Sequence, residues 1–134
     1  MNHTKLGGVV ERARSILIVD DDVHLCQLYR TALGLAGYTV RVAGDGLQAL
    51  REIDADPPDA VVLDLSLPYV DGFAVRQELA AHAHTRHIPV VVVTGSVDDL
   101  SHLDVPCVLR KPVDPDSVLD AVRRCLASGG TGLV

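Results

Sequence analysis

The chain has 134 residues, of which 48% are hydrophobic, and this composition excludes a disordered polypeptide and predicts a single globular domain. The formal net charge of −6 at pH 7 argues against direct binding of nucleic acid, because contacts to phosphate need clustered Lys and Arg. No apolar run is long enough to cross a membrane and the first residues lack a signal-peptide core, so we expect a cytoplasmic protein without a membrane partner. The three cysteines are widely spaced and form no CxxC pair, which is typical of reduced thiols in that compartment.

Apolar runs typical of strands alternate five times with amphipathic helical patterns along the chain. This alternation predicts an α/β fold, with a mostly parallel sheet and helices covering both of its faces. The strand patterns lie at Ser15–Asp20, Tyr38–Ala43, Ala60–Asp64, Ile88–Thr94 and Pro106–Leu109. The helical patterns lie between Asp22 and Gly37, between Asp45 and Pro57, from Gly72 to about Ala83 and from Asp114 to Leu126, while 97–103 has room for two helical turns at most.

One domain is predicted over residues 15–127, between an N-terminal extension over 1–14 and a flexible C-terminal tail over 128–134. The extension shows no clear period, and we expect at most a helical turn at Val9 and Val10. The stretch after Ala127 is too short for a DNA-binding or catalytic domain. We therefore expect either a stand-alone protein that acts through protein contacts or one domain of a longer chain.

Polar side chains stand at the ends of four predicted strands: Asp20 with Asp21, then Asp64, Thr94 and Lys111. Because the carboxyl ends of parallel strands meet at one edge of a sheet, we expect these groups to converge there. Two carboxylates about 4 Å apart repel by roughly 4 kcal/mol at an effective dielectric constant near 20, and a hard cation such as Mg²⁺ relieves that repulsion. An acid nucleophile at Asp64, flanked by a metal, an ammonium and a hydroxyl, is the arrangement that phosphoryl transfer requires.

Four motifs at these strand ends carry a resemblance to a known family. They are Ile-Leu-Ile-Val-Asp-Asp-Asp at 16–22, Asp-x-x-Leu-Pro-x-x-Asp-Gly at 64–72, Val-Thr-Gly at 93–95 and Lys-Pro at 111–112. In this order they resemble the receiver domain of response regulators from two-component signalling systems, over about Ser15–Ala127. The resemblance implies a flavodoxin-like, doubly wound sheet of five parallel strands in the order 2-1-3-4-5, as in chemotaxis regulators.

The resemblance also implies a phosphoacceptor and a metal site. Asp64 would receive a phosphoryl group, forming an aspartyl phosphate, from a histidine kinase or a histidine phosphotransfer protein. Mg²⁺ would be bound directly by Asp21, Asp64 and the backbone carbonyl of Ser66, and through water by Asp20.

Thr94 and Lys111 would complete the site in a protein similar to these regulators. Thr94 would supply the switch hydroxyl, and Lys111 would pair with the phosphoryl oxygens, directed inward by a cis bond to Pro112. The protein would then catalyse only its own phosphorylation and dephosphorylation, without turning over a substrate. We expect its signal to pass by contact with a downstream protein target, from a monomer or a homodimer. Alternatively, such a protein would be a shuttle in a phosphorelay.

Two features depart from the family pattern and keep other functions open. Val108 stands three residues before Lys111, where the family often has an aromatic residue, and the segment from Thr94 to Lys111 is short, which predicts a shortened or missing fourth helix. Both favour an alternative, a receiver-like interaction module that uses no phosphate. A Mg²⁺-dependent phosphohydrolase is a third hypothesis, which Ser66 disfavours because such an enzyme needs an acid-base residue two positions after its nucleophile.

We expect the histidines and cysteines elsewhere in the chain to be solvated or packing residues and not to bind metals or react. His82, His84 and His87 straddle a predicted helix end without a fixed common face, so we do not expect them to bind a metal. Cys26 and Cys125 fall on the apolar faces of predicted helices, and we interpret them as packing residues.

Overall fold

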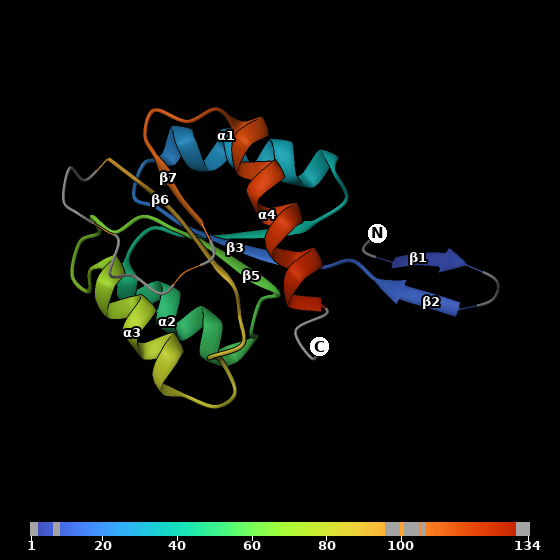
Figure 1. The fold of residues 1–134 in the computed structure, drawn as a ribbon, viewed down its shortest axis with the longest axis horizontal. Helices are drawn as coiled ribbons and strands as arrows, with labels where there is room; N and C mark the ends of the chain where they lie inside the picture. Colours follow the sequence, from blue (N-terminus) through green and yellow to red (C-terminus); the bar gives the residue numbers. More distant parts are fainter. Residues whose placement is uncertain (1–2, 7–8, 96–99, 101–104, 106, 131–134) are drawn as a thin grey trace.

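The computed structural model describes residues 3–6, 9–95, 100, 105 and 107–130, and Figure 1 shows how the chain is arranged. A five-stranded sheet forms its centre, with neighbouring strands parallel and in the order β4-β3-β5-β6-β7. These strands are β3 (Ser15–Val19), β4 (Thr39–Ala43), β5 (Ala60–Leu63), β6 (Val90–Thr94) and β7 (Cys107–Arg110). Numbered within this sheet alone, the order is 2-1-3-4-5, so the flavodoxin-like fold class is confirmed.

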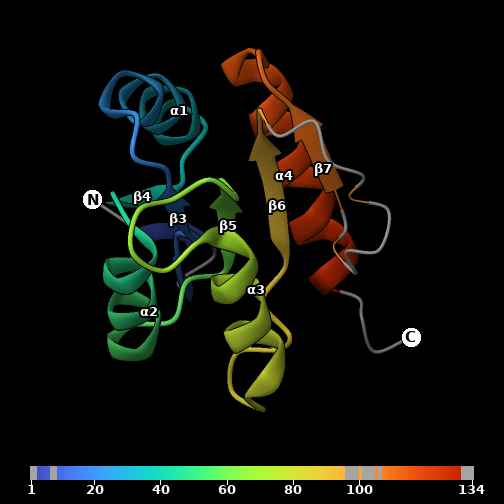
Figure 2. The same ribbon diagram turned by 90° about the vertical axis from the view of Figure 1, so that its left-hand side faces the viewer.

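Helices cover both faces of the sheet (Figure 2). Because successive side chains of a strand point to opposite faces, Ile16 and Ile18 of β3 belong to one apolar cluster and Leu17 and Val19 to the other. A strand buried on both faces must be apolar throughout, and this is why the strand patterns in the sequence are continuous and do not alternate. The first cluster lies against α1 (Val23–Leu35) and α4 (Pro115–Gly130), and the second against α2 (Gly46–Ala55) and α3 (Gly72–Ala81).

Each of these helices begins next to an aspartate whose carboxylate accepts a hydrogen bond from a backbone N–H of the first turn. Of the three consecutive acids after β3, it is Asp22 that caps α1, which leaves Asp20 and Asp21 available for a site. The four bonds run from Leu25 to Asp22 at 3.1 Å, from Gln48 to Asp45 at 2.7 Å, from Ala74 to Asp71 at 2.9 Å and from Ser117 to Asp114 at 2.7 Å.

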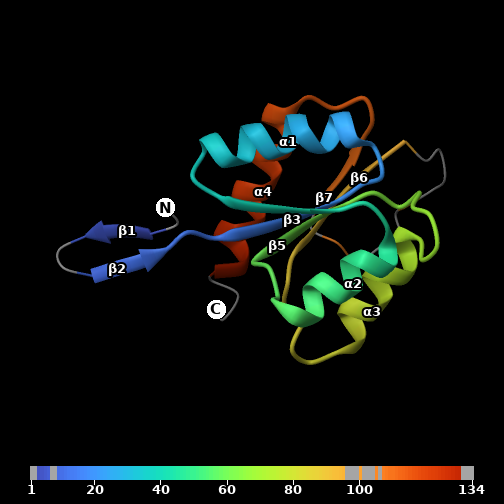
Figure 3. The same cartoon turned by 180° about the vertical axis from the view of Figure 1, so that it is seen from behind.

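The N-terminal extension contains a hairpin where we expected at most a helical turn. Strands β1 (His3–Leu6) and β2 (Val9–Arg12) pair in antiparallel fashion, and the hairpin projects beyond the sheet in Figures 1 and 3. The two β-branched valines that suggested the turn favour a strand once a second strand lies beside them. At the other end of the chain, α4 extends to Gly130, so residues 128–130 of the expected tail are helical.

The connection from β6 to β7 spans residues 95–106, where the family would place a further helix. The structure describes Gly95, Leu100 and Val105 of this connection; these three are not helical, and the latter two pack against the core. The shortness of the connection is consistent with a shortened or missing fourth helix, while the two helical turns considered for 97–103 fall mainly on residues outside those described. Among the described helices, none is long and apolar enough to cross a membrane.

Candidate functional site

The carboxyl ends of β3 and β5 bring Asp20 and Asp64 side by side. The parallel register pairs Val19 with Leu63, and the N–H of Asp64 donates to the carbonyl of Val19 at 2.9 Å. The N–H of Asp20 continues the ladder on the other side by donating to the carbonyl of Ala43 at 3.1 Å. Both aspartates are buried, with exposed fractions of 4% and 5%, so their carboxylates have lost most of their hydration.

Lys111 reaches this pair of acids from the far edge of the sheet. Its N–H donates to the carbonyl of Thr94 at 2.9 Å, which extends the pairing of β6 with β7, and its peptide bond to Pro112 is cis, as expected. The ammonium Nζ then donates to Oδ2 of Asp20 at 2.9 Å and to Oδ2 of Asp64 at 3.2 Å. Three side chains from three separate strand ends therefore meet at one point.

Burial and charge oppose each other in this group. Burial raises the pKa of Asp20, and the hydrogen bonds from Lys111 and from the N–H of Asp22 lower it without cancelling the effect of burial. Burial lowers the pKa of Lys111, but the hydrogen bond and charge of Asp20 and the charge of Asp64 outweigh it, and the net pKa is raised. The charged form of Asp20 is thus incompletely stabilised by one ammonium, and a further positive charge would favour it.

A metal ion is one source of that charge, and the residues present fit one. Asp20, Asp21 and Asp64 each offer a carboxylate oxygen, and these three oxygens lie within 4.8 Å of one another. Asp21 is exposed while the other two are buried, so the cluster opens to solvent on one side. An all-oxygen set of anionic ligands with access to water suits Mg²⁺, which binds carboxylates and keeps several of its waters.

Comparison with known proteins identifies the family to which this chain belongs. A family model described as the response regulator receiver domain matches residues 16–123. The chain belongs to this family. Receivers are signalling modules of two-component systems that work through phosphorylation, and they are generally not enzymes with a separate substrate.

Individual relatives of this receiver agree with the family assignment. The chain is 39% identical over 116 residues to the DNA-binding dual master transcriptional regulator RpaA of Synechocystis, covering 83% of this chain and 48% of that protein. It is 37% identical over 114 residues to the response regulator MprA of Mycobacterium ulcerans, covering 83% of this chain and 49% of that protein. The receiver therefore spans about half the length of these two relatives.

A solved structure supports the same assignment at the level of the fold. The signal receiver domain of a signal transduction histidine kinase from Syntrophus aciditrophicus superposes with a TM-score of 0.81 at 26% identity, covering 87% of this chain and 92% of that one.

The structure places the remaining expected site residues as follows. Thr94 is fully buried at the end of β6, and its carbonyl accepts the N–H of Lys111. Ser66 lies in the loop after β5, where its own N–H donates to Oδ1 of Asp64 at 3.1 Å. Both oxygens of Asp64 are therefore held, one by Ser66 and one by Lys111. The roles of these residues in phosphorylation stay predictions.

Sequence reasoning missed one residue that supports the receiver's acidic pair. Cys26, which we interpreted as a packing residue, also donates from Sγ to the carbonyl of Asp20 at 3.3 Å. Burial, and then the negative charge of Asp20, raise the pKa of this thiol to about 11. Cys26 is the fourth residue of α1, about one turn into the helix, and a spacing of six residues from Asp20 does not suggest this contact without the turn that Asp22 makes.

A second missed feature lies in the loop between β5 and α3. Its backbone is held closely at two glycines: a Cβ at Gly72 would collide with the carbonyl oxygen of Asp64, and a Cβ at Gly46 would collide with that of Val70. Between these contacts stands Tyr69, with a φ of 65° and an exposed fraction of 88%. The sequence signal was a bulky residue directly after Pro68, in a stretch that otherwise reads as a tight turn.

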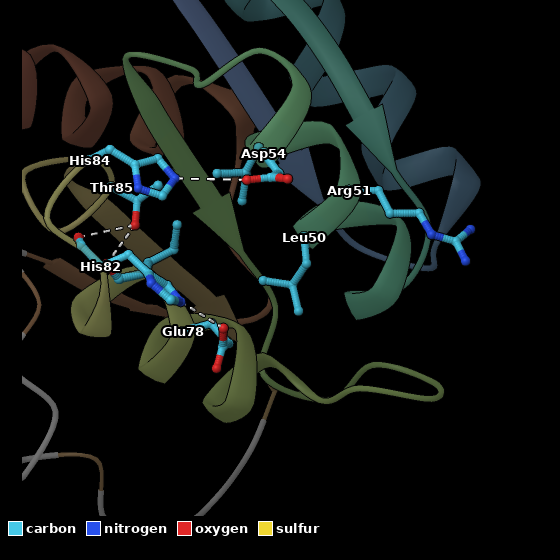
Figure 4. Close-up of a pocket in the computed structure, with 9 residues that line it drawn as sticks. Leu50, Arg51, Asp54, Glu78, His82, His84 and Thr85 are labelled. Atoms are coloured by element: carbon cyan, nitrogen blue, oxygen red, sulfur yellow. Dashed lines mark hydrogen bonds and ion pairs between the residues drawn. The ribbon is translucent and has the colours of Figure 1, made fainter.

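Two of the three histidines considered for a second metal site, His82 and His84, line a pocket between α2 and α3, and His87 does not line it (Figure 4). Nε2 of His82 lies 3.1 Å from Oε2 of Glu78, and Nε2 of His84 lies 3.8 Å from Oδ1 of Asp54. Each imidazole thus faces a different carboxylate, and within the described part of the receiver the one group of three or more clustered ligands is the aspartate cluster. That these histidines bind no metal stays a prediction.

Proposed function

We propose that this receiver is phosphorylated on Asp64 by a histidine kinase or a histidine phosphotransfer protein. The observation that carries the proposal is the convergence of Asp20, Asp64 and Lys111, within hydrogen-bond distance, at the edge where three strands end. Mg²⁺ would be held by Asp21, Asp64 and the carbonyl of Ser66, and by Asp20 through water. When bound, the metal supplies positive charge to the phosphoryl oxygens.

In the proposed transfer, a carboxylate oxygen of Asp64 attacks the phosphorus of a phosphohistidine. The bond from oxygen to phosphorus forms as the bond from phosphorus to the imidazole nitrogen breaks, and the electron pair of that bond stays on the nitrogen. The product is an acyl phosphate on Asp64 and a histidine on the donor. Lys111 and the N–H of Ser66 each occupy one lone pair of a different carboxylate oxygen, and each oxygen keeps a second lone pair for the attack.

Lys111 is the group suited to follow the transferred phosphoryl group. Its ammonium is on a flexible side chain that is 21% exposed, whereas the N–H of Ser66 belongs to the backbone of the loop. An ammonium that leaves Asp64 for the incoming phosphoryl oxygens stays close to Asp20 and neutralises new charge. The hydroxyl of Thr94 is the further donor that we propose for those oxygens.

We propose that the signal then passes to a downstream protein by direct contact, from a monomer or a homodimer in the cytoplasm. RpaA is named a DNA-binding regulator, but the matched region is 48% of that protein. The net charge of −6 supports the proposal that this chain does not itself bind nucleic acid.

Mass spectrometry of the intact protein tests the assignment. We expect one phosphoryl adduct after incubation with Mg²⁺ and phosphoramidate, and its loss in Asp64→Asn or when EDTA replaces Mg²⁺. Asp54→Asn, which removes an exposed acid in the pocket between α2 and α3, is the matched control and should keep the adduct. An adduct that survives in Asp64→Asn would contradict the proposal.

Val108 supports a second candidate, a receiver-like interaction module that uses no phosphate. This residue is half-buried, packs against the core on the α2 and α3 side of the sheet, and is not aromatic, where the family often has an aromatic residue. The same experiment separates the two candidates, because the module would show no adduct in the unmodified protein.

A further inference from the structure

Tyr69 combines an unfavourable backbone conformation with an almost fully exposed side chain. Among the described residues it is the one non-glycine residue with a positive φ, at 65°. The left-handed region crowds the Cβ of a bulky residue against the backbone, and glycine or asparagine occupies it far more easily. Since 88% of the tyrosine is exposed, packing into the core does not compensate for this strain.

The chain on both sides of Tyr69 holds it in that conformation. After it, Val70 packs against the core and its carbonyl lies against Gly46, where no Cβ could fit. The loop is closed by the N–H of Gly72, which donates to the carbonyl of Leu65 at 2.9 Å. The neighbouring residues therefore impose the backbone conformation at position 69, but they do not explain why a tyrosine stands there.

The position of Tyr69 relates it to the phosphoacceptor. It follows Asp64 by five residues in the same loop, at the edge of the sheet where the acids converge. Asp64 is only 5% exposed, so a donor protein must press its surface against the surrounding loops to bring an imidazole to the carboxylate. An exposed tyrosine in such a loop offers a large, rigid apolar area, and this residue type is enriched among those that dominate binding energy at protein interfaces.

We propose that Tyr69 is a contact residue for the protein that donates the phosphoryl group, and that it determines which donors the receiver accepts. The inference rests on the proposed function, because it assumes transfer to Asp64. The partner surface that fits is an apolar patch beside the phosphohistidine of the donor. Strained residues persist where they serve a function, and the exposed ring of Tyr69 contributes nothing to the packing of the fold.

The test compares a protein donor with a small one in Tyr69→Asn. Asparagine tolerates the left-handed conformation and removes the aromatic ring. The probes are phosphoramidate and a panel of purified histidine kinases and phosphotransfer proteins from the source organism, phosphorylated beforehand. We expect the rate of transfer from the most active protein donor, divided by the rate of labelling by phosphoramidate, to fall about tenfold or more. The melting temperature should rise by about 2 to 4 °C as the strain is relieved.

Two further variants make the result specific. Tyr69→Phe keeps the ring and should retain the ratio of the unmodified protein. Leu35→Asn removes a side chain that is similarly exposed, at 85%, from the far end of α1, and should also leave the ratio unchanged.

The outcomes separate this inference from the proposed function. An unchanged ratio in Tyr69→Asn overturns the inference, and so does an absence of transfer from every protein donor while phosphoramidate still labels Asp64. An equal loss with both donors also overturns it, because Tyr69 would then support the chemistry of the site and not the partner. Failure of the unmodified receiver to be labelled on Asp64 by any donor is instead a failure of the proposed function.

Discussion

Charged side chains gather at both edges of the sheet, and the two clusters differ in burial. At the carboxyl edge, the side chains of Asp20 and Asp64 are 4% and 6% exposed, and both are bonded to Lys111. At the amino edge, where α2 and α3 end, the pairs of His82 with Glu78 and of His84 with Asp54 are 53% to 83% exposed. Both clusters contain several acids and at least one potential cation.

The comparison shows that burial, and not the number of charged groups, makes one of these clusters a site. An exposed ion pair is screened by water and contributes between about 0 and 1 kcal/mol, so its members can be exchanged at little cost. Buried carboxylates have lost the stabilisation that water gives, so their charged form depends on each remaining hydrogen-bond and ion-pair partner. The same strands that bury Asp20 and Asp64 also fix the distance between them, whereas no strand fixes the distances in the exposed cluster.

The largest expected effect is that of Lys111→Ala, which leaves two buried carboxylates without their ammonium. We expect the free energy of unfolding without Mg²⁺ to fall by about 3 kcal/mol, the lower end of the range for breaking a buried ion pair, since Lys111 is partly exposed. Urea unfolding measures it. Saturating Mg²⁺ should restore about 2.7 kcal/mol at a concentration one hundredfold above its dissociation constant.

Arg124→Ala is the matched control, because it removes a cation from the exposed pair with Asp120, both 67% exposed. Its free energy of unfolding should change by less than about 0.5 kcal/mol. A loss below about 1 kcal/mol in Lys111→Ala would show that the acids at the carboxyl edge stay hydrated. Burial would then not distinguish the two charged clusters.

A smaller effect is expected from Cys26, beneath the acidic pair. Because its pKa is raised from 9.0 to about 11 in the folded protein, the native state keeps a proton that the unfolded state loses over this interval. Its contribution to stability is thus complete below pH 9 and is lost as the pH rises toward about 11, by roughly 2 kcal/mol.

Urea unfolding of the unmodified protein and of Cys26→Ala between pH 8 and 11 isolates this contribution. The raised pKa of Lys111 also makes the protein less stable as the pH rises, but Lys111 is present in both proteins. The difference between their free energies of unfolding therefore reports the contribution of the thiol. Identical pH profiles would mean that burial and the charge of Asp20 do not raise the pKa of the thiol.

The smallest effects should come from the pocket between α2 and α3. Glu78→Gln and Asp54→Asn each remove a charge from an exposed pair with histidine, and each should change the free energy of unfolding by less than about 0.5 kcal/mol. Thermal unfolding at pH 7 is the measurement. A loss above 1 kcal/mol in either variant would show that exposure is a poor guide to the importance of a charged pair in this fold.

The sheet and the main site residues could be predicted because they depend on local patterns. Continuous apolar runs such as Val61–Leu63 identify strands buried on both faces, and parallel strands place the residues that follow them at one edge. Asp20, Asp64 and Lys111 could therefore be grouped before any contact was known. The strand order itself came from the family resemblance.

The features that escaped prediction depend on contacts between distant segments. The left-handed conformation of Tyr69 follows from the approach of Val70 to Gly46, which no pattern near Tyr69 reveals. Likewise, β1 and β2 are strands by virtue of pairing with each other, and the apolar pair Val9-Val10 alone fits either a helix or a strand.

Strand β3 is held at its first residue by two hydrogen bonds between Ser15 and Asp59. The N–H of Ser15 donates to the carboxylate of Asp59 at 2.7 Å, and the N–H of Asp59 donates to the carbonyl of Ser15 at 2.8 Å. A mechanical load on the N-terminal hairpin would therefore be borne at this junction before it reached the interior of β3. Tags or fluorophores attached to the hairpin should report on its surroundings while leaving the phosphoacceptor end of the molecule undisturbed.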